Sequence, residues 1–125
     1  MGACMKFAQS LLLVSAGMVA GAGPALAHHA LAAEYDLNRS VMVTGTVVKV
    51  DWANPHVRIY LDTRRVRGGD AMYWELEMAS PNVLVLNGLK IDSLRPGDQV
   101  TVTAYPARNA SNLGYAFKVN YRTHI

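Results

Sequence analysis

Residues 41–62 read VMVTGTVVKVDWANPHVRIYLD. The first half of this stretch is rich in β-branched side chains, which favour strands. Asn54-Pro55 is a turn signal, and the residues after it alternate between apolar and polar, as in a strand with one buried face. The apolar set is Val57, Ile59 and Leu61. The stretch therefore predicts two strands that meet at a turn, with His56 directly after it, and Gly45 within the first strand predicts a bulge or a sharp bend.

Three more strands are expected, at residues 72–78, 99–105 and 115–122. A short helix is predicted over residues 81–87, because Ser80-Pro81 combines an N-cap with a proline at the first helical position and Asn87-Gly88 supplies a left-handed stop. Five strands with a helix between the third and fourth is the order of an OB-fold. The predicted fold is all-β with one short helix, a five-stranded OB-like Greek-key barrel. A five-stranded sandwich fragment is the alternative.

The third strand, MYWELEM, alternates in the same way as the second. Its inward set is Met72, Trp74, Leu76 and Met78, and its outward set is Tyr73, Glu75 and Glu77. Pairing the second and third strands with their apolar faces together places Arg58 opposite Glu75 or Glu77.

The first 27 of the 125 residues predict a cleaved export signal. Lys6 precedes an apolar run that ends in Ala25-Leu26-Ala27, the pattern that signal peptidase reads. We therefore expect a periplasmic protein that begins at His28, with an extended arm at residues 28–40 and a barrel domain at residues 41–125. The run is short for a spanning helix, so no stable membrane insertion is expected after cleavage. Cys4 leaves with the signal, which excludes disulfides and thiolate sites from the mature chain.

The charge of the mature chain is weak. Loss of Lys6 leaves eleven basic and nine acidic residues, and the basic ones are scattered except at residues 64–67. Such a balance lacks the basic footprint of a nucleic-acid-binding protein. We therefore predict that nucleic acid is excluded as a partner, and that the partner is a metal ion or a periplasmic protein.

Several motifs together resemble a family of small exported bacterial proteins of unknown function. They are His28-His29, Glu34-Tyr35-Asp36, Thr44-Gly45-Thr46-Val47, Trp52-Ala53-Asn54-Pro55-His56, Ser80-Pro81-Asn82 and Leu94-Arg95-Pro96-Gly97-Asp98. The resemblance covers nearly the whole mature chain. It implies export and a single compact β domain, and it carries no activity. Ala30 stands where the family often has a small hydroxyl residue after the two histidines.

Histidines carry the main functional hypothesis. A chain that begins at His28 offers its α-amine and imidazole, and His29 adds a mode with the amine, a backbone nitrogen and its own ring. Such nitrogen sets suit Cu(II) best. His56 at the start of the second strand completes the predicted site, so a periplasmic copper carrier or accessory protein is expected. The alternative is a frayed terminus and a histidine that hydrogen-bonds a turn. His124 has no ligand pattern near it.

The second hypothesis is a metal-free binding module for a protein, peptide or glycan. Its ligand residues lie on the outward face of the second and third strands, which OB-folds use for oligomeric ligands. They are Arg58, Tyr60, Tyr73 and Glu75. Cross-strand packing of amphipathic tyrosines is the alternative explanation.

Enzymatic activity is uncertain and less favoured than binding. Glu75 and Glu77 have a spacing near that of inverting glycosidases, but a solvated face explains them as well. The serines all have turn or cap explanations, so no Ser-His-Asp set is expected. Two other candidates have simpler explanations. The arginines of residues 64–67 are expected at a solvated hairpin tip and not in an anion site. Met72 and Met78 are expected in the core and not as Cu(I) ligands.

Overall fold

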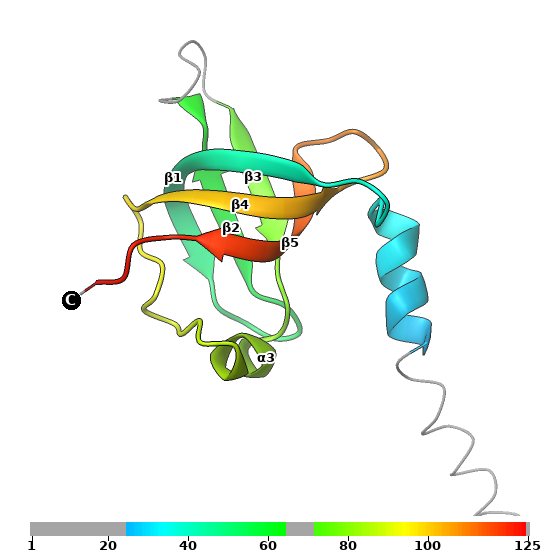
Figure 1. Ribbon diagram of the computed structural model, residues 1–125, viewed down its shortest axis with the longest axis horizontal. Helices are drawn as coiled ribbons and strands as arrows, with labels where there is room; N and C mark the ends of the chain where they lie inside the picture. The colour runs from blue at the N-terminus through cyan, green and yellow to red at the C-terminus, as the bar shows by residue number, and fades with distance from the viewer. Residues whose placement is uncertain (1–24, 65–71, 125) are drawn as a thin grey trace, which may run out of the picture. The chain divides into compact units, whose positions relative to one another are not determined.

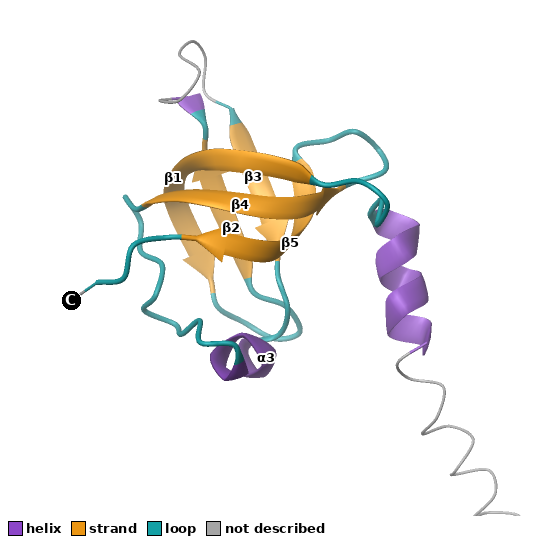
Figure 2. Cartoon of the chain, viewed as in Figure 1, coloured by secondary structure: helices purple, strands orange, loops and turns teal. Residues whose placement is uncertain are grey.

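Five strands close into a barrel in the computed structural model, which describes residues 25–64 and 72–124 (Figures 1 and 2). The elements are β1 (Val41–Asp51), β2 (Arg58–Asp62), β3 (Tyr73–Glu77), α3 (Pro81–Leu86), β4 (Gln99–Pro106) and β5 (Leu113–Asn120). The order around the barrel is β1-β2-β3-β5-β4, and all pairs are antiparallel except β3 with β5. The predicted OB-like Greek-key barrel is confirmed.

Strand β1 belongs to two parts of the barrel, because residues 41–46 pair with β4 and residues 46–51 pair with β2. Gly45 lies where these pairings meet. A Cβ at this position would be 2.8 Å from the backbone oxygen of Asp62, so only glycine permits the approach of β2. The register irregularity itself falls later, between Val47 and Lys49, and not at Gly45.

The core consists of the inward faces of the five strands and the segments that flank α3. The apolar set predicted from β2 and the residue before it is fully buried, as are Leu76 of β3 and Val102 of β4. Trp74 is only partly buried against the core, and Met72 precedes β3 and is exposed. The inward set predicted for the third strand is therefore correct for Leu76 and Met78 and wrong for Met72.

Helix α3 begins as predicted, with the Ser80 side chain accepting a hydrogen bond from the Val83 N–H, and it ends at the Asn87 cap. Only Leu84 of this helix is buried. Val83 is exposed, and Leu86 is 87% exposed. Because so short a helix turns only a narrow stripe toward the barrel, one apolar side chain of α3 joins the core and the others stay exposed.

Strand β5 does not keep a simple alternation. Gly114 and Ala116 face inward, but the register shifts opposite Thr103 and Ala104, which leaves Phe117 exposed. Beyond this irregularity Val119 and Tyr121 pack against the core. A bulge thus interrupts the aromatic and apolar series that the sequence shows at residues 115–121.

The chain divides into two units, Met1–Ala33 and Glu34–Ile125. Residues 25–34 are helical, so the expectation of an extended arm at residues 28–40 is wrong there. This segment is rich in alanine and leucine, which have high helix propensity. The second unit starts before the predicted domain boundary at residue 41, because the backbone of Asp36 donates to Pro106 and that of Arg108 donates to Glu34. Tyr35 and Ala107 form a β-bridge between these bonds.

Two sequence predictions fall largely outside the described residues. They are the export signal, of which residues 1–24 are not described, and the hairpin tip, of which residues 65–71 are not described. Within the described ranges, no helix has the length and apolar character needed to cross a membrane.

Candidate functional site

A buried carboxylate lies on the outer face of the sheet, where the sequence predicts an exposed one. Glu77 ends β3 and is in register with Arg58 of β2 and Tyr115 of β5. It is nevertheless only 8% exposed. The Tyr35 ring, itself 1% exposed, lies beside Tyr115 with 5.8 Å between the ring centroids. The segment before β1 thus supplies an aromatic side chain that is buried next to this carboxylate.

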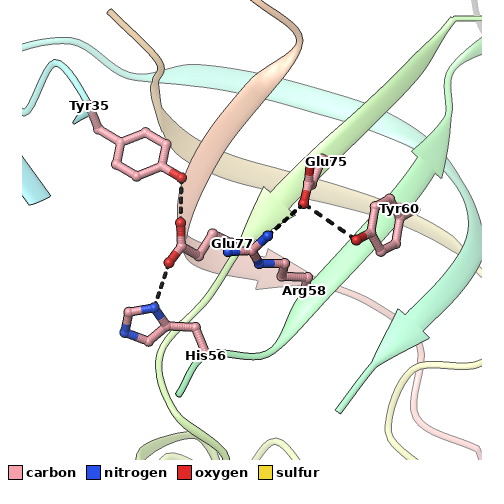
Figure 3. A network of polar contacts seen from close by, with 6 residues as sticks. All are labelled: Tyr35, His56, Arg58, Tyr60, Glu75 and Glu77. Atoms are coloured by element: carbon pink, nitrogen blue, oxygen red, sulfur yellow. Dashed lines mark hydrogen bonds and ion pairs between the residues drawn. The ribbon is translucent and has the colours of Figure 1, made fainter. Parts of the chain in front are cut away.

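Each oxygen of Glu77 has its own hydrogen-bond partner (Figure 3). The Tyr35 hydroxyl donates to Oε2 at 2.5 Å, and Nδ1 of His56 lies 2.5 Å from Oε1. With the Glu77 carboxylate ionised, both of its oxygens can only accept, and the hydrogen between His56 and Glu77 then belongs to Nδ1. Glu77 therefore sets the orientation of the His56 ring.

The backbone after the turn places His56 next to β3. The Asn54–Pro55 peptide bond is cis, and His56 follows it directly. Val57 then donates its N–H to Ala79 at 3.1 Å and accepts from Met78 at 2.8 Å. The Tyr115 ring meets the imidazole edge-on at 6.3 Å between centroids. The side chain of His56 remains 41% exposed, so the ring is held on one side and open on the other.

Burial governs the two tyrosines beside Glu77. Burial, and then the hydrogen bond to Glu77, raise the pKa of Tyr35 far above its ordinary value of 10.0. Burial, and then the charge of Glu77, also raise the pKa of Tyr115. Tyr35 thus keeps its proton and remains a donor to Glu77 throughout the neutral range.

A second polar group lies beside the first, on the outer side of β2 and β3 (Figure 3). Oε1 of Glu75 accepts from Arg58 at 3.1 Å and from the Tyr60 hydroxyl at 3.3 Å. Arg58 is in register with Glu77 but forms its ion pair with the diagonal neighbour Glu75. Burial lowers the pKa of Arg58, but the charges of Glu77 and Glu75 outweigh burial, so the pKa is raised. Lys49 lies over the Tyr60 ring at 5.6 Å. Both carboxylates of the suggested glycosidase pair are therefore engaged.

The four residues predicted for ligand binding lie on this one face. Three of them, Arg58, Tyr60 and Glu75, form the group just described, and Tyr73 at the start of β3 is 54% exposed. Burial, and then the charge of Glu75, raise the pKa of Tyr60. Arg58, Tyr60, Tyr73 and Glu75 together form the β2–β3 face.

The three histidines predicted to bind copper do not all belong to the same unit. His28 and His29 lie in the helix of residues 25–34, and His56 lies in the barrel. Among the residues that the structure describes, no group of three or more His, Cys, Asp or Glu side chains is placed to hold a metal ion. Copper binding by this set stays a prediction.

Sequence reasoning missed the partners of two histidines. Alternation along β3 correctly places Glu77 on the outer face but does not show which side chain covers it, and in the sequence Tyr35 stands out only as part of a motif. At the other end of the chain, Nε2 of His124 lies 2.7 Å from Oδ2 of Asp98. This hydrogen bond, helped by the backbone of Arg95, lowers the pKa of Asp98.

Comparison with known proteins places the chain in a family. A model of the family of unknown function DUF6152 matches residues 15–116. The chain belongs to this family. No protein with curated annotation matches it. The resemblance to a family of unknown function is thereby confirmed, and the family brings no activity with it.

Among solved structures, the barrel resembles the mitochondrial single-stranded DNA-binding protein Rim1 of S. cerevisiae. One crystal form gives a TM-score of 0.52 at 14% identity, over 68% of this chain and 94% of Rim1. Another gives 0.51 at 12% identity, over 68% and 93%. At this identity the likeness establishes the fold and not a ligand.

The likeness to Rim1 also corrects one prediction. The weak net charge predicts that nucleic acid is excluded as a partner, and this prediction is wrong, because the same barrel architecture occurs in a single-stranded DNA-binding protein. Net charge alone does not decide the ligand class of an OB-like barrel, since stacking on aromatic side chains contributes to such binding independently of charge.

Proposed function

We propose that the barrel is a binding module that holds an extended polar oligomer across the β2–β3 face. The observation that carries this proposal is the arrangement of Arg58, Tyr60, Tyr73 and Glu75 on adjacent strands of one accessible face. OB-folds bind oligonucleotides and oligosaccharides on this same surface, between the β1–β2 and β4–β5 loops. The family membership leaves this function open.

The chemistry of the face suits a glycan. Glu75 offsets the charge of Arg58, so the face offers hydrogen-bond donors and acceptors without a strong field of one sign. Tyr60 and Tyr73 each combine an apolar ring with a hydroxyl, which matches the apolar faces and hydroxyl edges of sugar rings. A peptide and single-stranded DNA are the competing ligands.

Binding assays with three probes test this proposal: a glycan array, an array of extended peptides, and oligothymidine. We expect glycan binding that Tyr60→Ala and Tyr73→Ala each weaken by about tenfold, the factor that ~1.4 kcal/mol of lost contact produces. Met42→Ala is the matched control, because Met42 is an exposed side chain of β1 opposite Thr103 of β4. It should leave binding unchanged.

Two results would count against the proposal in different ways. Wild-type affinity in both tyrosine variants would rule out the β2–β3 face. Binding of oligothymidine alone, with loss in the tyrosine variants, would keep the face and replace the glycan by nucleic acid.

We further propose that the chain is exported and acts in the periplasm after loss of residues 1–27. The apolar run and the Ala25-Leu26-Ala27 motif support this. Intact-mass analysis of periplasmic protein should show a chain that begins at His28. A chain that keeps residues 1–27 would contradict it.

Copper binding at the processed terminus is the second candidate function. The observation that favours it is the exposure of two adjacent imidazoles, those of His28 and His29, whose ring centroids are 6.3 Å apart. With a free amine they offer the nitrogen donors that Cu(II) prefers. A protein that begins at His28 should bind one Cu(II) with a nitrogen-rich paramagnetic resonance spectrum, and one extra residue in front should weaken it. Equal binding by both forms would end this candidate.

A further inference from the structure

One side of the His56 ring has no partner within the described residues. Nδ1 is held by Glu77, whereas Nε2 lies on the opposite side of the ring and points away from the carboxylate (Figure 3). The side chain is partly exposed, and the Tyr115 ring limits its rotation by packing against it edge-on. With the hydrogen on Nδ1, a neutral His56 presents the lone pair of Nε2 to solvent.

The arrangement around His56 is the one that prepares a histidine for a metal ion. Metal-binding histidines commonly donate their second ring N–H to a carboxylate, which fixes the tautomer and raises the basicity of the ligating nitrogen. Glu77 is such a carboxylate, and both its oxygens are already engaged. Tyr35 holds the far oxygen, so the carboxylate cannot turn away from the ring without losing a buried hydrogen bond.

The hydrogen-bond network runs from the buried interior to the surface. Tyr35 and Glu77 are buried among packed side chains, whereas the imidazole is at the surface. The barrel thus directs the free nitrogen of a fixed imidazole outward.

We propose that His56 is a metal ligand of the barrel, that it binds through Nε2, and that Glu77 and Tyr35 are its positioning residues. Imidazole nitrogen suits late first-row divalent cations, and Cu(II) binds tightest among them. Since the described residues hold no group of three or more His, Cys, Asp or Glu side chains placed for a metal ion, water completes the coordination. The site requires neither the β2–β3 face nor the terminal histidines, so it goes beyond both functions proposed above.

The first test is nuclear magnetic resonance of the imidazole nitrogens in the full exported chain without metal. Above the range where histidine protonates, we expect His56 to carry its hydrogen on Nδ1 and to show an unprotonated Nε2. Glu77→Gln should reduce this tautomer preference while the backbone spectrum stays that of the folded barrel. A hydrogen on Nε2 in the wild-type protein would overturn the proposal.

The second test is a Cu(II) titration in a chain that also carries His28→Ala and His29→Ala, which removes the terminal imidazoles. Cu(II) should broaden the ring signals of His56 before those of other residues, and His56→Ala should abolish this binding. Glu77→Gln should weaken it by about 10–100-fold, the usual effect of removing such a partner. Tyr35→Phe should weaken it in the same direction.

His124 supplies the matched control. It is also paired with a carboxylate, but through Nε2, so the nitrogen that remains is Nδ1, next to its own backbone. His124→Ala should leave the titration unchanged. The proposal is overturned if the ring of His56 is not broadened, or if a folded Glu77→Gln variant binds Cu(II) as tightly as its parent. Because the terminal histidines are absent, either result leaves the terminal copper candidate untouched.

Discussion

Among the residues that the structure describes, two histidine–carboxylate pairs have nearly equal lengths but different surroundings. His56 and Glu77 are 2.5 Å apart, and His124 and Asp98 are 2.7 Å apart. Glu77 is nine-tenths buried in the sheet and also accepts from Tyr35. The Asp98 side chain is 20% exposed, lies in a turn, and accepts from the backbone of Arg95.

From these surroundings we expect the two pairs to contribute differently to stability despite their similar lengths. Near water, two charges interact through a high dielectric, and an exposed pair contributes about 0–1 kcal/mol. In a buried site, losing one partner leaves a carboxylate without the water that would otherwise solvate it. Stability should therefore respond strongly to changes around Glu77 and weakly to changes around Asp98.

The largest effect is expected from Tyr35→Ala, which removes a fully buried ring together with the hydroxyl that donates to Glu77. Truncation of a buried aromatic side chain costs about 3–5 kcal/mol, because a cavity remains. Denaturant unfolding measures the loss. Tyr73→Ala is the matched control, since Tyr73 is exposed, and it should cost less than ~1 kcal/mol. Equal losses would show that Tyr35 does not fasten the segment before β1 to the barrel.

Tyr35→Phe separates the hydroxyl from the ring. Loss of a hydrogen bond to a charged acceptor should cost about 1.5–3 kcal/mol near neutral pH. The raised pKa of Tyr35 adds a test: the unfolded chain ionises near the ordinary value of 10.0, while the folded one does not. The contribution is thus complete below pH 10.0 and is lost as the pH rises further.

Unfolding free energies of the wild type and Tyr35→Phe, measured from neutral to alkaline pH, check this sign. The difference between the two proteins should shrink above pH 10.0. A difference that stays constant across that range would mean that folding does not raise the pKa of Tyr35.

His56→Ala tests the other side of Glu77. Because His56 is partly exposed, water can replace some of its contact, and we expect a loss of about 1–2 kcal/mol. His124→Ala should cost less than His56→Ala, since Asp98 keeps both water and the Arg95 backbone. Thermal or denaturant unfolding of both variants gives the ratio. A larger loss at His124 would reverse the comparison between the two pairs.

The fold was predictable because its signals are local. Alternation in β2 and the Ser80-Pro81 start of α3 each depend on a few adjacent residues. The outer set of β2 and β3 followed from the same alternation. This alternation correctly predicted which residues lie on the β2–β3 face. It did not predict that Arg58 forms its ion pair with the diagonal neighbour Glu75 and not with Glu77, which lies directly opposite.

The candidate site was less predictable because its members are distant in the sequence. Tyr35 and Glu77 are 42 positions apart, and alternation cannot show that one covers the other. The helix of residues 25–34 was not predicted, because its sequence has no capping signal and only its alanine content favours a helix. The exposure of Phe117 was not predictable from the sequence either, because a bulge depends on the register against β4 and breaks the alternation on which prediction relies.

The smallest effect is expected at Asp98, where pH supplies the measurement. Its pKa is lower in the folded chain than the ordinary value of 3.8, first because of the hydrogen bond to His124. Its contribution is therefore present above pH 3.8 and is lost as the pH falls through the folded pKa. Because the pair is near water, Asp98→Asn should cost less than ~1 kcal/mol at neutral pH, and this difference should vanish in acid. A cost that equals that of Tyr35→Phe, or that persists in acid, would show that Asp98 stabilises the turn by something other than its charge.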